Sequence, residues 1–80
     1  MFVILKKKDS ELFIFIGYFQ GYPDYNRIRG IDFVFDCRIF PLMEDCVEAY
    51  NRIKYECPDI RIVPLNELQQ RIQEHFLENF

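Results

Sequence analysis

The sequence predicts one α+β domain over residues 1–80, in which a mostly antiparallel four-stranded sheet packs against two helices in the order β-β-β-α-β-α. Half of the residues are hydrophobic and 18% are aromatic, a composition that disordered chains lack. Residues 1–40 carry apolar runs separated by turn-forming residues, which is typical of strands. Residues 42–57 and 64–80 carry apolar positions three and four residues apart, which is typical of amphipathic helices. A chain of 80 residues has room for one domain.

The first two predicted strands form a hairpin. Residues 1–5 (MFVIL) are apolar, and residues 12–20 (LFIFIGYFQ) have the same character after a short polar segment. Asp9 and Ser10 suit a tight turn between them, because their short side chains bond readily to the local backbone. We therefore expect the two segments to pair side by side.

The third strand is predicted at residues 31–40 (IDFVFDCRIF), because apolar residues recur there with a period of two. The preceding residues 21–30 (GYPDYNRIRG) are rich in glycine, proline, aspartate and asparagine, which predicts a loop. One face of the predicted strand is wholly apolar and requires a covering layer: Ile31, Phe33, Phe35, Cys37 and Ile39.

Two helices and a short strand complete the prediction. The first helix covers residues 42–57 and ends before Pro58, which disfavours helical geometry in the residue before it. Residues 60–63 (IRIV) form the fourth strand, and the second helix follows it to the end of the chain. The apolar stripe of the first helix is Met43, Cys46, Val47, Tyr50, Ile53 and Cys57. The stripe of the second helix is Leu65, Leu68, Ile72, Phe76 and Phe80.

The connection from the third strand through the first helix to the fourth strand resembles a crossover. Crossovers join parallel strands, so we expect the third and fourth strands to run parallel. Pairing of the fourth strand with the first gives the sheet order 4-1-2-3.

The second strand is apolar on both faces. A regular alternation places Phe13, Phe15 and Phe19 together, opposite a face that is equally apolar. One helix covers only one of these faces, and monomers rarely expose a patch of this kind. Three solutions remain: the second helix covers the second face, two copies pack sheet to sheet, or a partner protein uses the face.

Charge and composition exclude several classes of protein. The formal net charge is −3 and the pI is about 5.0, which argues against a protein that wraps nucleic acid through phosphate contacts. No window approaches the ~20 apolar residues of a membrane span. The basic residues Lys6–Lys8 follow the first apolar run, whereas a secretory signal has the opposite order. We expect a cytoplasmic protein with no direct contact to nucleic acid or membrane.

The residues that usually carry chemistry are scarce. Three cysteines, Cys37, Cys46 and Cys57, include no Cys-x-x-Cys pair, and there is only one histidine, so no zinc signature is present. We interpret the cysteines as buried thiols in a reducing compartment and His75 as a surface or boundary imidazole. The chain contains no threonine and one serine, Ser10. These observations predict a non-enzymatic protein without metal or cofactor.

Two clusters are candidates for protein contact. The first lies in the predicted loop, where tyrosine and arginine, both enriched at binding hot spots, are interleaved: Tyr22, Asp24, Tyr25, Arg27 and Arg29. The second is the acidic start of the first helix, which suits a basic surface: Glu44, Asp45 and Glu48. For the first cluster the alternatives are a plain connecting loop or a site that stacks bases and holds phosphates. For the second cluster the alternative is ordinary helix capping.

Residues 36–65 (DCRIFPLMEDCVEAYNRIKYECPDIRIVPL) resemble a pattern found in small proteins of phages and other mobile elements of Gram-positive bacteria. In that β-β-β-α-β pattern a short strand ends in Phe, here Phe40, and a helix follows with small residues at the positions of Cys46 and Ala49. A strand of Ile and Val then alternates with charge, as in residues 60–63. The chain departs from the pattern in having cysteine where alanine is common, and in its second helix.

The resemblance implies a function. Those relatives that are understood tend to be stoichiometric inhibitors of host machinery, anti-CRISPR proteins among them. The expectation is therefore a non-enzymatic inhibitor that binds a host protein and occludes a site on a defence nuclease. The alternative is a homodimeric accessory protein, antitoxin-like or a phage subunit, held by the Phe13–Phe15–Phe19 face.

Overall fold

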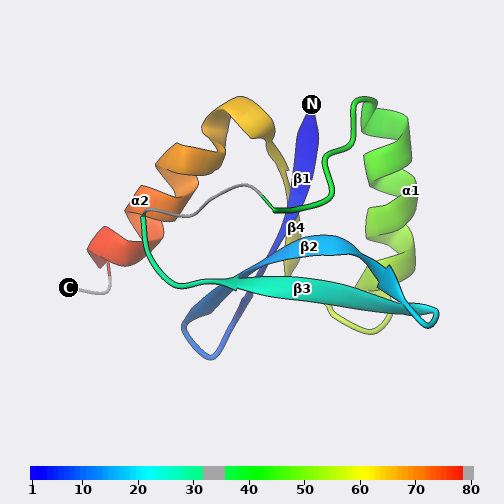
Figure 1. Ribbon diagram of the computed structural model, residues 1–80, viewed down its shortest axis with the longest axis horizontal. Helices are drawn as coiled ribbons and strands as arrows, with labels where there is room; N and C mark the ends of the chain where they lie inside the picture. Colours follow the sequence, from blue (N-terminus) through cyan, green and yellow to red (C-terminus); the bar gives the residue numbers. More distant parts are fainter. Residues whose placement is uncertain (32–35, 79–80) are drawn as a thin grey trace.

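The computed structural model describes residues 1–31 and 36–78, and within them the predicted α+β class and element order are confirmed (Figure 1). A short 3-10 turn, η1, precedes the last helix. The elements are β1 (Phe2–Lys8), β2 (Glu11–Phe19), β3 (Tyr22–Ile28), α1 (Met43–Lys54), β4 (Ile60–Pro64), η1 (Leu65–Glu67) and α2 (Leu68–Glu78).

The four strands form one sheet in the order β3-β2-β1-β4, as predicted. Every neighbouring pair is antiparallel, so the expected parallel relation of the third and fourth strands is wrong. The crossover rule assumed that a strand leads directly into α1. Instead, the described residues 36–40 lie between β3 and α1 in the chain, with Arg38 bonded to Phe15 and Phe40 bridged to Phe2, so β3 does not lead directly into α1.

The third strand lies earlier than predicted, at Tyr22–Ile28, which was expected to be a loop. Residues 36–39 are irregular, and only Phe40 forms a bridge, to Phe2; residues 32–35 lie outside the described part. The reason is the turn at Gln20 and Gly21, whose φ angles are 50° and 83°. Positive φ at both central residues is the geometry of a tight hairpin turn, so the chain pairs with β2 immediately.

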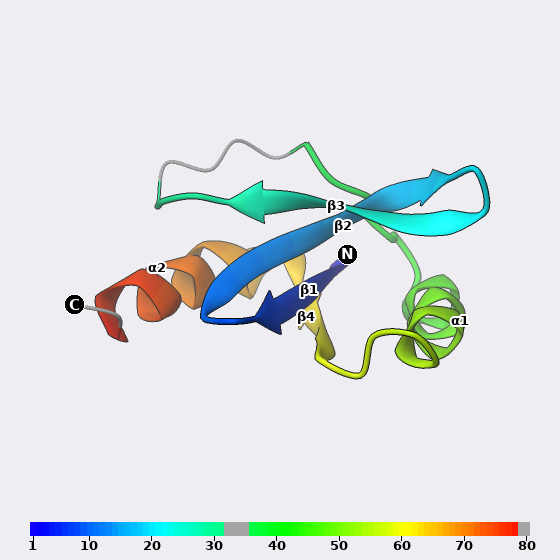
Figure 2. The same cartoon turned by 90° about the horizontal axis from the view of Figure 1, so that it is seen from below.

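The apolar residues form two clusters, one on each face of the sheet. Leu68 and Ile72 of α2 pack with Val3, Leu5 and their neighbours. The other cluster joins α1 to the opposite face of β1, β2 and β4, and contains Ile4, Phe15, Phe40, Cys46, Ala49, Ile53 and Ile60. Figures 1 and 2 show the two helices on opposite sides of the strands. Of the three solutions left open by the sequence, the structure shows the first, in which α2 covers the second face.

A bulge in β2 changes the predicted facing of its aromatic residues. The register with β3 shifts between Phe15 and Gly17, and Gly17 adopts a φ of 134°, which favours glycine. Tyr18 therefore lies on the face of Phe15, with the ring centroids 5.3 Å apart. Phe19 then falls on the opposite face, so the prediction that Phe13, Phe15 and Phe19 share one face is wrong.

The segment around Phe40 fills the space where β1 and β2 diverge. β1 pairs with β2 only through Leu5–Lys8, and the backbones of Phe2 and Phe40 exchange two hydrogen bonds of 2.8 Å beyond that point. Arg38 N donates to the Phe15 oxygen at 3.0 Å, and the Phe40 ring stacks on Phe15 at 6.2 Å. This segment therefore closes the α1-side core.

Both helices bury a stripe that differs from the predicted one. In α1 the buried residues are Cys46, Ala49 and Ile53, whereas Met43 and Val47 are exposed. In α2, His75 is only 6% exposed, which contradicts its assignment to the surface or boundary. His75 is three residues after Ile72 and seven after Leu68, so it lies on the same side of the helix.

Two phenylalanines of β2 provide a direct test of this arrangement. Phe15 is 1% exposed and Phe19 is 65% exposed. Replacing Phe15 by alanine should lower the free energy of unfolding by about 3–5 kcal/mol, because it leaves a cavity in the core. The change Phe19→Ala should cost less than about 0.5 kcal/mol. Urea unfolding followed by circular dichroism measures both, and equal losses would contradict the bulged register.

Candidate protein-binding surface

The outer end of the β2–β3 hairpin projects from the body of the protein. Beyond Ile14, β2 no longer pairs with β1, and the hairpin extends to one outer end of the molecule, on the side of α1 (Figure 2). Phe19 and Tyr22 are directly paired across the strands next to the turn. They are 65% and 68% exposed, so two large aromatic side chains are presented to solvent together.

The opposite face of the same hairpin rests against α1. The guanidinium of Arg52 lies 5.3 Å from the centre of the Tyr18 ring, and Tyr18 contacts the edge of Phe15. A cation over an aromatic ring contributes about 0.5–1 kcal/mol at an exposed site. These contacts hold the hairpin in place while leaving the Phe19–Tyr22 side uncovered.

The predicted tyrosine and arginine cluster is not a single surface. Its residues alternate along β3, so Tyr22 and Asp24 face one way and Tyr25 and Arg27 face the other. Asp24 accepts a hydrogen bond from Tyr25 N at 2.9 Å. Arg27 pairs with Glu11 at 3.1 Å. Of this set, Tyr22 is the aromatic residue that remains fully available for contact.

Arg29 lies just beyond β3 and is exposed. It follows Ile28, which is buried in the α2-side core. The two arginines predicted to act together are therefore separated, since Arg27 is held by its ion pair within the hairpin.

Tyr25 has a structural role. Its ring packs at the edge of Phe15, with centroids 6.0 Å apart, and Lys6 Nζ lies 4.5 Å from its centre on the same face. The hydroxyl oxygen is buried, and no hydrogen-bonding partner for it occurs among the described residues. Burial raises the pKa of Tyr25 well above its ordinary value of 10.0, and the neighbouring Cys57 thiol raises it further.

The acidic start of α1 is exposed, as its sequence predicted. Glu44, Asp45 and Glu48 all lie in solvent, where the positive end of the helix dipole stabilises acidic residues. Sequence reasoning missed the exposed apolar residues among them, Met43 and Val47. This acidic turn and the hairpin end lie near opposite ends of α1 (Figure 1), so the two predicted contact sites do not adjoin.

Phe13 is neither fully buried nor fully exposed. It is half-buried on the face of Phe15, and Lys6 Nζ lies 5.6 Å from its ring centre. The Lys6 side chain thus extends over both Phe13 and Tyr25. α1 covers Phe15 and Lys6 shields Phe13, so the described residues of β2 offer no continuous aromatic face to a second sheet.

The three cysteine thiols are wholly or partly buried. Cys46 is buried and Cys37 and Cys57 are half-buried, all as free thiols. Burial raises the pKa of Cys46 and of Cys37 above the ordinary value, which keeps these thiols protonated and weakly nucleophilic. Within residues 1–31 and 36–78, no group of three or more His, Cys, Asp or Glu side chains is placed to hold a metal ion.

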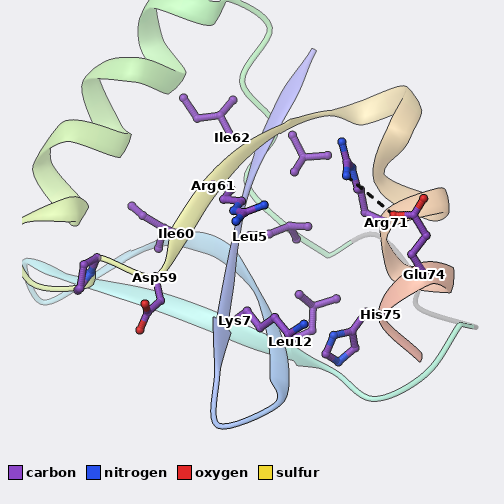
Figure 3. A pocket seen from close by; sticks show the side chains of 12 residues that line it. Leu5, Lys7, Leu12, Asp59, Ile60, Arg61, Ile62, Arg71, Glu74 and His75 are labelled. Carbon is purple, nitrogen blue, oxygen red and sulfur yellow. Dashed lines mark ion pairs between the residues drawn. The ribbon is translucent and has the colours of Figure 1, made fainter. Parts of the chain in front are cut away.

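A groove of about 510 Å³ lies between α2 and the strands β1 and β4, at the β4 edge of the sheet. Figure 3 shows its apolar floor, to which Leu5 and Leu12 contribute, and the charged side chains around it. Arg71 and Glu74 face it from α2, with Arg71 Nη1 3.9 Å from Glu74 Oε2. Nothing in the sequence pattern indicated this groove, since its residues come from elements far apart in the chain.

Comparison of the chain with protein-family models, with curated proteins and with solved structures found no match. None of the described helices combines the length and the apolar composition needed to cross a membrane. Assignment of a function therefore depends on the surfaces described above.

The buried hydroxyl of Tyr25 predicts a pH effect on stability. The folded protein retains this proton to higher pH than the unfolded chain, so rising pH above about 10 favours unfolding. The change Tyr25→Phe should leave stability at pH 7 unchanged or slightly higher, because it removes a buried unsatisfied group. It should also reduce the loss of stability between about pH 9 and pH 11. Urea unfolding across this range measures both, and parallel pH profiles for the two proteins would contradict the assignment.

Proposed function

We propose that this protein is a non-enzymatic binding module that occludes a site on another protein, with the outer end of the β2–β3 hairpin as its contact. The observation that supports the proposal is the exposed cross-strand pair of Phe19 and Tyr22. Large aromatic residues dominate the energetics of protein interfaces. The pair stands on a two-residue turn between paired strands, so little conformational freedom is lost on binding.

A protein partner fits this surface better than a nucleic acid. Aromatic residues can stack on bases, but such sites combine them with a basic groove that follows the phosphates. Here Asp24 lies on the same face as Tyr22, and the chain carries a net charge of −3. An apolar pocket on a protein surface matches the aromatic pair without requiring a basic surround.

The proposed partner is a host protein of a nucleic-acid-processing defence complex, and the proposed effect is inhibition. The resemblance to mobile-element proteins supports this form of the proposal. The acidic start of α1, with Glu44, Asp45 and Glu48, would supply long-range attraction to a basic surface such as a nuclease presents. The hairpin end would then supply the apolar contact.

The alternative homodimer depended on the Phe13–Phe15–Phe19 face. That face does not exist as a surface, because α1 covers Phe15 and the bulge turns Phe19 to the other side. We therefore do not propose a homodimer held by these three phenylalanines.

The hairpin contact can be tested with a matched pair of surface changes. The double variant Phe19→Ser, Tyr22→Ser removes the aromatic pair. The control is the variant Tyr55→Ser, because Tyr55 lies at the end of α1 and is 95% exposed. Each protein is immobilised and exposed to a Gram-positive host lysate, and captured proteins are quantified by mass spectrometry. We expect a partner captured by the unchanged protein and by Tyr55→Ser, with at least about tenfold less on the double variant.

A captured nuclease would then be assayed for cleavage at increasing ratios of inhibitor to enzyme. Loss of activity at a stoichiometric ratio supports occlusion. Equal capture by all three proteins would exclude the hairpin as the contact, and a captured nuclease of undiminished activity would exclude inhibition.

A further inference from the structure

β4 is an edge strand, and its outer side has no backbone hydrogen bond to the described part of the chain. Lys7 N donates to the Asp59 oxygen at 3.1 Å, and Leu65 N donates to the Met1 oxygen at 2.8 Å. In an antiparallel pair, alternate residues direct their backbone groups to the partner strand. Asp59, Arg61, Val63 and Leu65 are therefore directed to β1, and the intervening residues Ile60, Ile62 and Pro64 are directed outward.

The outer edge of β4 can form only a few backbone hydrogen bonds with an added strand. Ile60 and Ile62 each present one N–H and one carbonyl oxygen, whereas Pro64 presents a carbonyl oxygen alone. Unpaired edges of this kind accept an added strand. The proline limits the match to a short segment.

The groove described above continues around this edge. Its lining includes Arg61 and Val63, which face α2, and also Ile60 and Ile62, which belong to the α1-side cluster. Lys7 and Arg71 add two more cations, so the lining carries three cationic side chains against two acidic ones, Asp59 and Glu74. Figure 3 shows these side chains along β1, β4 and α2. The lining thus carries a formal charge of +1, with Arg71 paired to Glu74, in a chain whose net charge is −3.

We propose that this groove binds an extended acidic peptide segment of another protein by strand addition to β4. A residue opposite Arg61 on the added strand would direct its side chain to the same face, about 5 Å away. A carboxylate at that position reaches Arg61 and faces Arg71 across the groove. The residues on either side of it would face the α1 side of the sheet, next to Ile60 and Ile62, where apolar side chains fit.

A second copy of this chain fits the edge poorly. Two β4 strands that pair antiparallel through the outward groups of Ile60 and Ile62 would place one Arg61 directly opposite the other. Like charges in that position destabilise a strand pair. This site is also separate from the hairpin end, because it lies on the opposite edge of the sheet from β3.

The test uses a blocked peptide of about six residues in which valine alternates with glutamate. Its titration into the isotope-labelled protein is followed by amide chemical shifts and by hydrogen exchange. We expect the shifts to centre on Ile60 and Ile62 and the exchange of their amide protons to slow. The matched peptide with lysine in place of glutamate should bind at least about tenfold more weakly.

The charge contribution is tested by the double variant Arg61→Glu, Arg71→Glu, with Lys54→Glu on the exposed side of α1 as control. We expect the double variant to weaken binding of the glutamate peptide by at least about tenfold and the control by less than about twofold. Unchanged melting temperatures establish that the variants remain folded.

Three outcomes would overturn the proposal. Equal binding of the two peptides, or shifts centred away from β4, removes strand addition by an acidic segment. Inorganic phosphate producing the same slowed exchange at Ile60 and Ile62 would show a simple anion site. The same protection appearing on raising the concentration of the protein alone would assign the edge to a second copy.

Discussion

The central strand β1 is buried on both faces, and the rest of the structure depends on this constraint. Val3 and Leu5 face α2, and Ile4 between them faces α1. Burying a side chain of this size contributes about 1.5–3 kcal/mol, and a domain of this length has few such side chains to bury. Both faces of the sheet therefore require a helix, and the chain supplies one for each.

The alternation within the strands and the spacing within the helices were sufficient to predict the class, the element order and the strand order. Residues 2–14 pair as the pattern indicated, because local turn chemistry and apolar character agree there. The stretch 21–30 was misassigned because Gly21, Pro23 and Asn26 resemble a loop in composition. The positive φ of Gln20 made the turn shorter than its sequence indicated, and no local pattern reveals that angle.

The candidate site was predicted only in part. Tyr22 was singled out as a candidate contact residue and is exposed in the structure, but its cross-strand partner Phe19 was assigned to a buried or dimeric face. The cause is the bulge at Gly17, which reverses the facing of every β2 residue beyond it. The groove beside β4 depends on four elements meeting in space, which is tertiary information. His75 was misjudged because polar residues on a buried stripe are less common than apolar ones.

Because helices cover both faces of the sheet, the surfaces that remain for binding another molecule lie at its edges and at the ends of the elements. The hairpin end offers an aromatic pair, the start of α1 offers acidic charge, and the β4 edge offers unpaired backbone groups. These three surfaces differ in chemistry, and the β4 edge lies on the opposite edge of the sheet from β3.

The most direct test of the two-sided core is a nuclear Overhauser experiment on the protein at a concentration where light scattering shows a monomer. Methyl protons of Ile72 should give contacts to Val3 and Leu5, and those of Ile53 should give contacts to Ile4 and the Phe15 ring. Contacts from both helices to the same face of β1, or contacts that arise only between differently labelled molecules, would contradict the account.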